Sequence, residues 1–536
     1  MSYETETSLE QHMVSIIRRI TNYLNSHRLL IWILILFVSY VYGYELFNVH
    51  ITIDEEISAF RSETNLAFLT SGRWGLFLFA NLFFQKSVIP FLPLATTLLF
   101  ILIGILLLLE TVSLPNKLAC FLITAMGLAW SGFVYVFSFS VINFAIGFGF
   151  LCISLSLYLL TKGNGAGKLW AAIPIAFVIS IYQPLLQPLV MVFLLYPLYH
   201  WREERHNFLR FLLNALLALG IGFVLYYGIQ QLFLFAFNTS TSTYVTHYFD
   251  FANLFANIGW YLQKLARLFY NVMVGDSSFY SITVRALPIF LFVAGLIILI
   301  GEFKKRERTS YYLLFLVLLA IFTIMPFIGG ILTKGYIPYR SLLGVPMFLV
   351  GWAALAFKNA GQRSRWLLSI LAALTLFQFA SSTNHLFASS AFAYEEDKIL
   401  ATQLIQRIED EIENTGVVSP LYLEMVGYVQ RPSTPLVSRI ENIGASFFGW
   451  DGGRTNRVTN FLRILGYTSV DALPLERRSA YVDQGITMPV WPAKGSVQVV
   501  GDVVLVKFSP YSRQQVEAIC AEADPNALPM GFCPQP

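Results

Sequence analysis

Residues 94–109 read LATTLLFILIGILLLL, a run of sixteen positions without a charged side chain. Such a run approaches the roughly 20 apolar residues that an α-helix needs to cross a bilayer. Similar runs recur through the first two thirds of the chain, and 56% of all residues are hydrophobic while 13% are charged. Because soluble domains carry about 25% charged residues, the sequence predicts an α-helical polytopic membrane protein.

Windows of about 20 apolar residues predict eleven transmembrane helices. These lie at 29–48, 90–110, 117–137, 141–160, 169–185, 185–200, 210–236, 286–301, 310–331, 341–357 and 366–383. The fifth and sixth meet at Gln183 and Pro184, which are compatible either with a very tight turn or with one kinked helix. No cleaved signal peptide is apparent in residues 1–28, which we expect to form a cytoplasmic N-terminal segment.

The distribution of Lys and Arg predicts the orientation, because short cytoplasmic loops of membrane proteins are enriched in both. With eleven spans and the N-terminus inside, the inner segments hold sixteen Lys and Arg residues, and the outer loops before Asn384 hold eight. Those outer loops are 49–89, 238–285 and 332–340. We therefore expect a multi-pass membrane protein with a transmembrane domain at 29–383 and a domain at 384–536 outside the cytoplasm, which in the inner (cytoplasmic) membrane of a bacterium means the periplasm.

The C-terminal part differs in composition, with 12 Lys and Arg against 17 Asp and Glu after Asn384, and 24 against 15 before it. Its apolar patterns predict helices near 395–414 and 455–465 and strands at 421–429 and 497–508, hence a small α/β domain. Cys520 and Cys533 would lie in the oxidising periplasm and are candidates for a disulfide, although the sequence leaves their pairing open.

Three successive carboxylates, Asp54, Glu55 and Glu56, follow the first predicted span and are candidate catalytic residues. The simpler interpretation is an acidic helix start, because carboxylates favour the first turn of a helix. Arg73 and Trp74 interrupt an amphipathic stretch later in the same loop, so the loop is predicted to fold onto the membrane surface. This context favours a functional role for the acids.

Lys and Arg in the outer loops run against the preference of these residues for cytoplasmic loops. They suggest a second part of a functional site. Lys334 and Arg340, with Tyr336 between them, would suit an anionic lipid phosphate, although snorkelling toward lipid headgroups explains them equally simply. His247 lies in the loop 238–285, where a surface-lying helix near 250–274 is expected either to wall a cavity or merely to tether the loop.

In the C-terminal part, Trp450, Asp451 and Arg454 surround a Gly-rich turn. This composition suits stacking on sugar rings, or packing of the turn against the membrane domain. Asp54 and Glu55 would also suit a hard divalent cation, so the metal question stays open. No cluster of Lys and Arg accompanies the aromatic residues, which argues against nucleic-acid binding.

The chain resembles the Gtr-type serotype-converting O-antigen glucosyltransferases. The resemblance is carried by the acidic triplet, by Gly72-Arg73-Trp74, Tyr182-Gln183 and Arg340, and by Trp450-Asp451-Gly452-Gly453-Arg454. Relatives often have Asp-Asp-Glu where this chain has Asp-Glu-Glu, which leaves the division of roles between Glu55 and Glu56 open.

This resemblance implies a GT-C-like fold and an inverting transfer of glucose from undecaprenyl-phosphate glucose to lipid-linked O-antigen of lipopolysaccharide. The placement of charge at the outer surface suggests Asp54 as the catalytic base, Glu55 or Glu56 as the residue that orients it or the acceptor, and Arg340, Lys334 and Arg73 as ligands of the donor phosphate. Together with the outer-loop residues His247 and Tyr336, the motifs of the resemblance predict a substrate cavity lined by Trp74, Tyr182, Gln183, Trp450, Asp451 and Arg454. Membrane lipids, a donor-synthesising transferase and a donor flippase are the implied partners.

Three other functions fit parts of the sequence. A polyprenyl-lipid transporter or flippase would also need many spans, although repeated halves and charges at mid-membrane depth are not evident. A receptor or scaffold would leave the acids of the first loop unexplained. An enzyme of the same architecture could instead transfer aminoarabinose or mannose, because the sequence does not name the sugar, the acceptor residue or the linkage.

Overall fold

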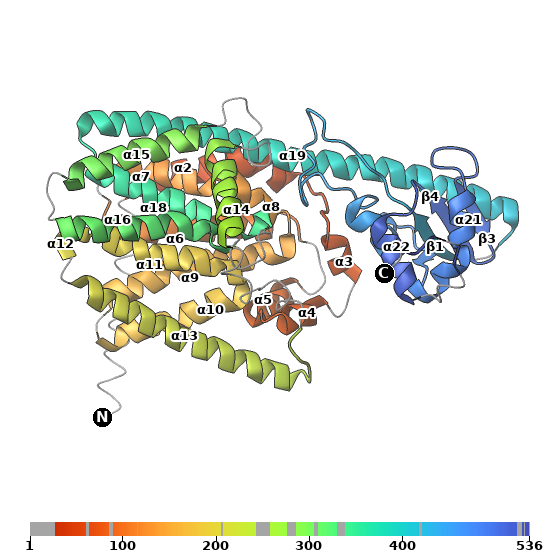
Figure 1. The fold of residues 1–536 in the computed structure, drawn as a ribbon, viewed down its shortest axis with the longest axis horizontal. Coiled ribbons are helices and arrows are strands. Elements are labelled where there is room, and N and C mark those ends of the chain that lie inside the picture. The colour runs from red at the N-terminus through yellow and green to blue at the C-terminus, as the bar shows by residue number, and fades with distance from the viewer. Residues whose placement is uncertain are drawn as a thin grey trace.

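The fold is an elongated helical bundle with a small sheet beyond one of its ends (Figure 1). The computed structural model describes residues 27–60, 64–84, 89–114, 116–163, 165–204, 207–242, 258–275, 286–304, 309–329, 338–417, 421–522, 528–529 and 531–534. We call the sheet, its flanking helices and the second half of the helix that leads into them the C-terminal module. Most of the described residues are helical.

Seven helical segments of the described part are long and apolar enough to cross a membrane. These are α2 (Arg28–Phe47), α6 (Leu92–Thr111), Lys117–Phe137 with α7 (Lys117–Leu128) and α8 (Val134–Phe137), α9 (Ser140–Lys162), α13 (Phe208–Ala236), α15 (Leu287–Lys304) and α19 (Gln362–Thr415). The shorter helices of the bundle include α10 (Ala172–Ile181), α11 (Leu186–Tyr199), α16 (Thr309–Ile324) and α18 (Gly344–Asn359). Each predicted span overlaps one of these helices, and the number that crosses the membrane stays a prediction.

The junction of the fifth and sixth predicted spans is a tight turn. Tyr182 is extended, with φ −159° and ψ 118°, and it separates α10 from a single 3-10 turn that leads into α11. α11 ends at the end of the bundle where the carbonyl of Tyr199 accepts a hydrogen bond from Lys358. The start of α9 and the Tyr182 turn lie at the other end, which faces the C-terminal module (Figure 1).

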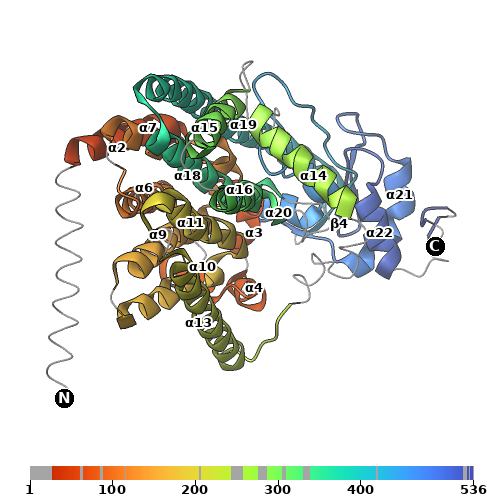
Figure 2. The same ribbon diagram turned by 60° about the vertical axis from the view of Figure 1, so that its left-hand side comes forward.

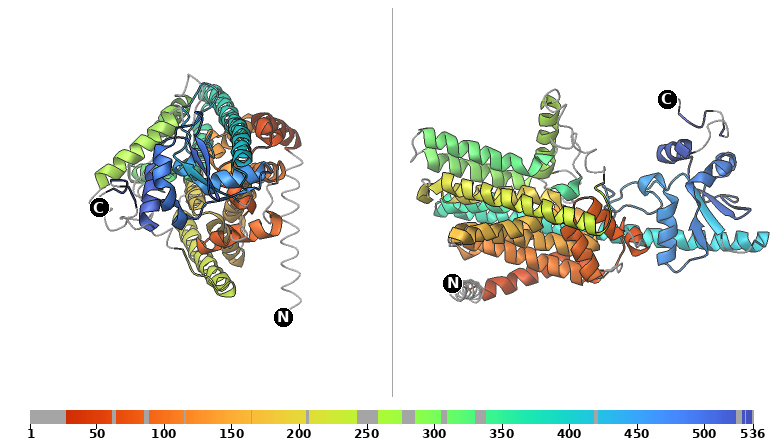
Figure 3. Two further views of the ribbon diagram at one scale, coloured as in Figure 1. Left: turned by 90° about the vertical axis from the view of Figure 1, so that its right-hand side faces the viewer. Right: turned by 90° about the horizontal axis from the view of Figure 1, so that it is seen from below.

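Helix α19 runs without a break from the bundle into the C-terminal module (Figure 3). In the bundle, Thr383 donates to the Ala129 carbonyl at 3.0 Å and Asn384 donates to the Val41 carbonyl at 2.9 Å. Further along, Leu404 and Ile408 are buried in the core of the module. The helix expected near 395–414 is therefore the second half of α19 rather than a separate element.

The module contains a four-stranded sheet of order β2-β1-β4-β3. Its strands are β1 (Leu421–Val426), β2 (Val470–Ala472), β3 (Val497–Val500) and β4 (Val503–Lys507), with β1 parallel to β2 and β4 and with β3 antiparallel to β4. The single strand expected at 497–508 was wrong, because the chain reverses at Gly501, whose φ is +62°. Helix α20 (Thr455–Ile464) lies between β1 and β2 in sequence, and α22 (Arg513–Glu522) carries Cys520, which forms a disulfide with Cys533.

The first loop lies between the bundle and the module. It forms α3 (Glu55–Phe60), α4 (Thr64–Thr70) and α5 (Trp74–Phe79). Ile53, just before α3, is buried in the core of the C-terminal module rather than in the bundle. Helix α14 (Ile258–Tyr270), from the second long loop, lies across the direction of the bundle helices (Figure 1).

Candidate active site

The acidic triplet lies where α3 packs against α20 of the C-terminal module (Figure 2). Asp54 has a φ of +80°, a left-handed conformation that Asp and Asn adopt more readily than most side chains. The three carboxylates have different surroundings, and the Asp54 side chain is 46% exposed whereas that of Glu56 is 0% exposed. Asp54 is therefore the member of the triplet that solvent reaches, whereas Glu55 and Glu56 are buried.

Glu55 holds the first loop on the start of α9. Its carboxylate accepts hydrogen bonds from the backbone N–H of Ser140 at 2.7 Å and of Thr52 at 2.9 Å. The first N–H groups of a helix have no partner within the helix and favour a negative charge. Burial raises the pKa of Glu55, and the hydrogen bonds from Ser140 and Thr52 oppose that rise. We interpret Glu55 as a positioning residue.

Arg457 of α20 joins the first loop to the C-terminal module. Its Nη2 donates to Oδ1 of Asp54 at 2.8 Å, its Nε donates to Oδ2 of Asp451 at 2.8 Å, and its Nη1 pairs with Oε1 of Glu56. The Arg457 side chain is only 6% exposed. A buried guanidinium is stable only with such partners. We call these four residues the Arg457 cluster.

Sequence reasoning named the three acids of this cluster but missed Arg457. A signal was present in the pattern of α20, where Val458 and Phe461 are buried on neighbouring positions of the same helix. An arginine that shares the buried side of a helix needs an acidic partner, since Arg is almost never fully buried alone. That rule would have predicted a carboxylate contact without naming the carboxylate.

The buried Glu56 predicts a stability that depends on pH. Burial raises the pKa of Glu56 from 4.5 to about 7, against the opposing charge of Arg457 and with a small further rise from Asp54. The folded protein therefore keeps a proton that the unfolded chain releases, so this contribution to stability is complete below pH 4.5 and is lost as the pH rises through about 7. Glu56→Gln cannot titrate, and we expect it to remove this decline in the thermal unfolding midpoint of the detergent-purified protein.

The matched control for this measurement is Glu517→Gln, because Glu517 pairs with Arg513 on an exposed helix surface. This control should keep the wild-type pH profile. Parallel unfolding profiles for the wild type and Glu56→Gln between about pH 5 and 8 would contradict the assignment, since that range contains the transition of a group that titrates near 7.

A second polar cluster surrounds the turn between α10 and α11. Nε of Arg73 donates to Oε1 of Gln183 at 3.0 Å, and the Arg73 guanidinium lies 4.9 Å from the centre of the Tyr182 ring. Gln183 in turn donates to the Ser71 carbonyl at 3.2 Å. Three residues predicted from the sequence, Arg73, Tyr182 and Gln183, are thus brought together from segments more than a hundred positions apart.

Trp74, predicted to line a cavity, is instead buried in a local core. Its ring is 2% exposed and lies 5.3 Å from the ring of Phe177 and 6.3 Å from that of Phe233. Its Nε1 donates to the Tyr226 carbonyl at 3.2 Å, which satisfies the indole N–H. We interpret Trp74 as the residue that fixes the first loop against α13.

Arg340 lies beside the same turn. The Oγ of the next residue, Ser341, is 3.3 Å from Oη of Tyr182, and the Arg340 guanidinium lies 5.7 Å from the centre of the Phe139 ring. Burial raises the pKa of Glu441 to about 6, against the opposing hydrogen bond from the backbone N–H of Tyr339 and the charge of Arg340. Arg73 therefore contacts Tyr182 directly, and Arg340 is next in sequence to a residue that contacts it.

The N-cap Phe139 and the first residue of α9 contact one acid of the triplet and one of the arginines. Glu55 accepts a hydrogen bond from the backbone N–H of Ser140. The guanidinium of Arg340 lies over the ring of the adjacent Phe139. Acidic side chains and arginine side chains thus both lie near the start of α9, at the end of the bundle that faces the C-terminal module. This arrangement can accept a proton on one side and hold an anion on the other.

The remaining predicted residues are distributed as follows. Trp450 packs at the edge of the module core, and Arg454 is exposed beside a cavity that Asp451 also lines. Within the described ranges, no group of three or more His, Cys, Asp or Glu side chains is arranged to hold a metal ion. The predictions for Lys334, Tyr336 and His247 lie outside the described residues.

A model of the family described as glucosyl transferase GtrII matches residues 43–357. This range is more than half of the 536 residues, and it contains the acidic triplet, Arg73, Tyr182 and Arg340. The chain belongs to the GtrII glucosyl transferase family. Nothing matches in comparisons with curated proteins and with solved structures. The family and the apolar helices together indicate a membrane glycosyltransferase, whereas Arg457 and the sheet lie outside the matched range.

Proposed function

We propose that this GtrII family member transfers glucose from undecaprenyl-phosphate glucose to lipid-linked O-antigen, with inversion at the anomeric carbon. In this proposal the reaction takes place on the periplasmic face of the inner membrane. The N-terminus is cytoplasmic, and residues 384–536 are periplasmic. The family match and the joint position of acids and arginines at one end of the bundle support the proposal.

Asp54 is the proposed general base. Its exposure carries the assignment, because a base must reach the acceptor hydroxyl, and Glu55 and Glu56 are both buried. Among the described residues, Asp54 pairs through Oδ1 with Arg457, so Oδ2 is available to an incoming hydroxyl. As the acceptor oxygen bonds to the anomeric carbon, Asp54 takes the hydroxyl proton and the bond from that carbon to the donor phosphate oxygen breaks.

Arg340 and Arg73, with Lys334, are the proposed ligands of the departing phosphate. Guanidinium groups bind phosphate oxygens through paired, charge-assisted hydrogen bonds. They stabilise the negative charge that the phosphate gains as it leaves. Arg73 lies over the Tyr182 ring, and Arg340 precedes Ser341, whose Oγ is 3.3 Å from Oη of Tyr182, which supports a shared anion site.

Replacing Arg340 with Ala should therefore impair use of the donor. We expect kcat/KM for the donor to fall by about 10- to 100-fold, the range that follows from losing one hydrogen bond to a charged group. The KM for the acceptor should change little. Arg363→Ala is the matched control, since Arg363 is an exposed arginine near the start of α19. An unchanged donor KM and kcat in Arg340→Ala would contradict the phosphate role.

The function itself is tested by transfer of radiolabelled glucose from undecaprenyl-phosphate glucose to lipid-linked O-antigen in membranes that contain the protein. We expect labelled O-antigen with this donor. Transfer only from polyprenyl-phosphate mannose or aminoarabinose would replace the proposed sugar and keep the reaction class. Movement of the donor lipid across vesicles without any transfer would overturn the proposal in favour of a transporter.

A further inference from the structure

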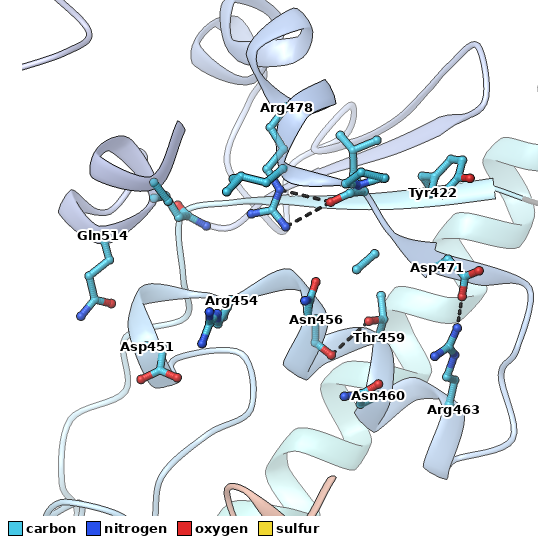
Figure 4. Close-up of a pocket in the computed structure, with 16 residues that line it drawn as sticks. Tyr422, Asp451, Arg454, Asn456, Thr459, Asn460, Arg463, Asp471, Arg478 and Gln514 are labelled. Atoms are coloured by element: carbon cyan, nitrogen blue, oxygen red, sulfur yellow. Dashed lines mark hydrogen bonds and ion pairs between the residues drawn. The ribbon is translucent and has the colours of Figure 1, made fainter. Parts of the chain in front are cut away.

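A polar cavity of about 800 Å³ lies in the C-terminal module, outside the range that matches the family (Figure 4). Residues of α20, of the segment after β2 and of α22 line it. Pockets that bind small molecules have volumes of about 300–1,000 Å³. The cavity is therefore large enough for a specific ligand.

One face of α20 supplies hydrogen-bonding groups to the cavity. Asn456, Thr459 and Asn460 line it, at the spacing of three and four that places side chains on one face of a helix. Val458 and Phe461 on the other side are buried in the core of the module. The backbone carbonyl of Asn456 accepts a hydrogen bond from Oγ1 of Thr459. The side-chain amides of Asn456 and Asn460 have no hydrogen-bond partner among the described residues, so both remain available to a ligand.

Most charges in the cavity are already neutralised. Arg463 pairs with Asp471, and Arg478 pairs with the buried Glu424 at 3.2 Å. Arg454 is exposed in the cavity, and no carboxylate among the described residues pairs with it. The lining therefore combines neutral amides, paired charges and one guanidinium without a carboxylate partner among the described residues, which is not the composition of a lipid-tail site.

We propose that this cavity binds a saccharide segment of the acceptor glycan, an assignment that rests on the function proposed above. Sugar hydroxyls donate and accept hydrogen bonds, which side-chain amides can match in both directions and Arg454 can match as a donor. Asp451 lines the cavity and also pairs with Arg457, which holds the proposed base Asp54. A glycan in the cavity thus lies next to the Arg457 cluster.

The test uses the full-length protein in lipid nanodiscs. The probe is O-polysaccharide released by mild acid from the lipopolysaccharide of the host strain, so that it lacks its lipid. Isothermal titration should detect binding by the wild type, and Arg454→Ala should weaken it at least about tenfold, as expected for a lost hydrogen bond to a charged group. The double variant Asn456→Ala with Asn460→Ala should do the same. In transfer assays these variants should raise the acceptor KM without changing the donor KM.

Arg513→Ala is the matched control, because Arg513 is a 91% exposed arginine on α22 that does not line the cavity. Equal affinity of the wild type and the cavity variants would overturn the inference, as would a wild type that transfers glucose without binding the released polysaccharide. Both results leave the proposed function standing. A third result would be that the wild type binds the polysaccharide, the cavity variants do not, and no sugar is transferred. This result would support the saccharide site and overturn the proposed reaction.

Discussion

Replacing Asp54 with Asn should lower glucose transfer by about 10²- to 10⁴-fold, the usual contribution of a general base. Asn cannot take the proton of the acceptor hydroxyl, yet its amide oxygen can still accept the hydrogen bond from Arg457. Asn also tolerates the φ of +80° at this position, so the turn before α3 should be kept. Binding of the donor, measured by titration with undecaprenyl-phosphate glucose, should be unchanged.

The comparison that isolates the base is Asp451→Asn. This substitution removes one of the negative charges that surround Arg457. Asp451 also has a positive φ, +52°, so its backbone conformation is of the same kind as that of Asp54. If loss of charge around Arg457 were the whole effect, both variants would lose activity equally. We expect Asp451→Asn to retain far more activity, and near-wild-type turnover in Asp54→Asn would disprove the assignment of the base.

Arg457→Ala should have the largest effect on stability. Glu56 is 0% exposed and is ionised in the wild type only above about pH 7. Above that pH, removal of its cation leaves the carboxylate either buried as an unpaired charge or obliged to take up a proton, and breaking such a buried pair costs about 3–5 kcal/mol. Contact between α3 and α20 depends on the same side chain. We expect a lower unfolding midpoint in detergent, together with loss of transfer, because Asp54 loses its anchor.

A double-mutant cycle with Glu56→Gln tests this explanation. Because Gln is neutral, the pair Arg457→Ala with Glu56→Gln should recover part of the stability, giving a coupling energy of about 1–3 kcal/mol. Arg454→Ala provides the control on the same helix, where an exposed arginine should contribute about 0.5 kcal/mol or less. A wild-type unfolding midpoint in Arg457→Ala would contradict a buried role for the arginine.

The helices were predictable because a bilayer fixes the length of an apolar helix, so runs such as 94–109 stand out in the sequence. The sequence could not choose between a turn and a kink at Tyr182, because packing of α11 against its neighbours decides that question. The drop in hydrophobicity after Asn384 suggested a boundary, yet helix formation does not depend on hydrophobicity, and α19 continues through it. The Gly-Asp pair at 501–502 was an available hairpin signal inside a Val-rich run.

The candidate site was predictable only where it is local in sequence. Three adjacent acids are visible to inspection, whereas Arg457 lies 403 positions from the Asp54 that it holds. Likewise, Arg73 and Gln183 are 110 positions apart. Such pairs depend on how helices pack, and one sequence carries little information about that. Local chemistry therefore identified the acids and the arginines, and tertiary structure supplied their partners.

The unbroken α19 also limits how substrates reach this site. The helix has 54 residues and contains neither Pro nor Gly, the residues at which helices usually bend sharply. The C-terminal module therefore has no hinge in this helix and cannot swing open like a lid above the bundle. For the lipid-linked polymer of the proposed function, an immobile module implies that the acceptor enters and leaves laterally, between the module and the end of the bundle.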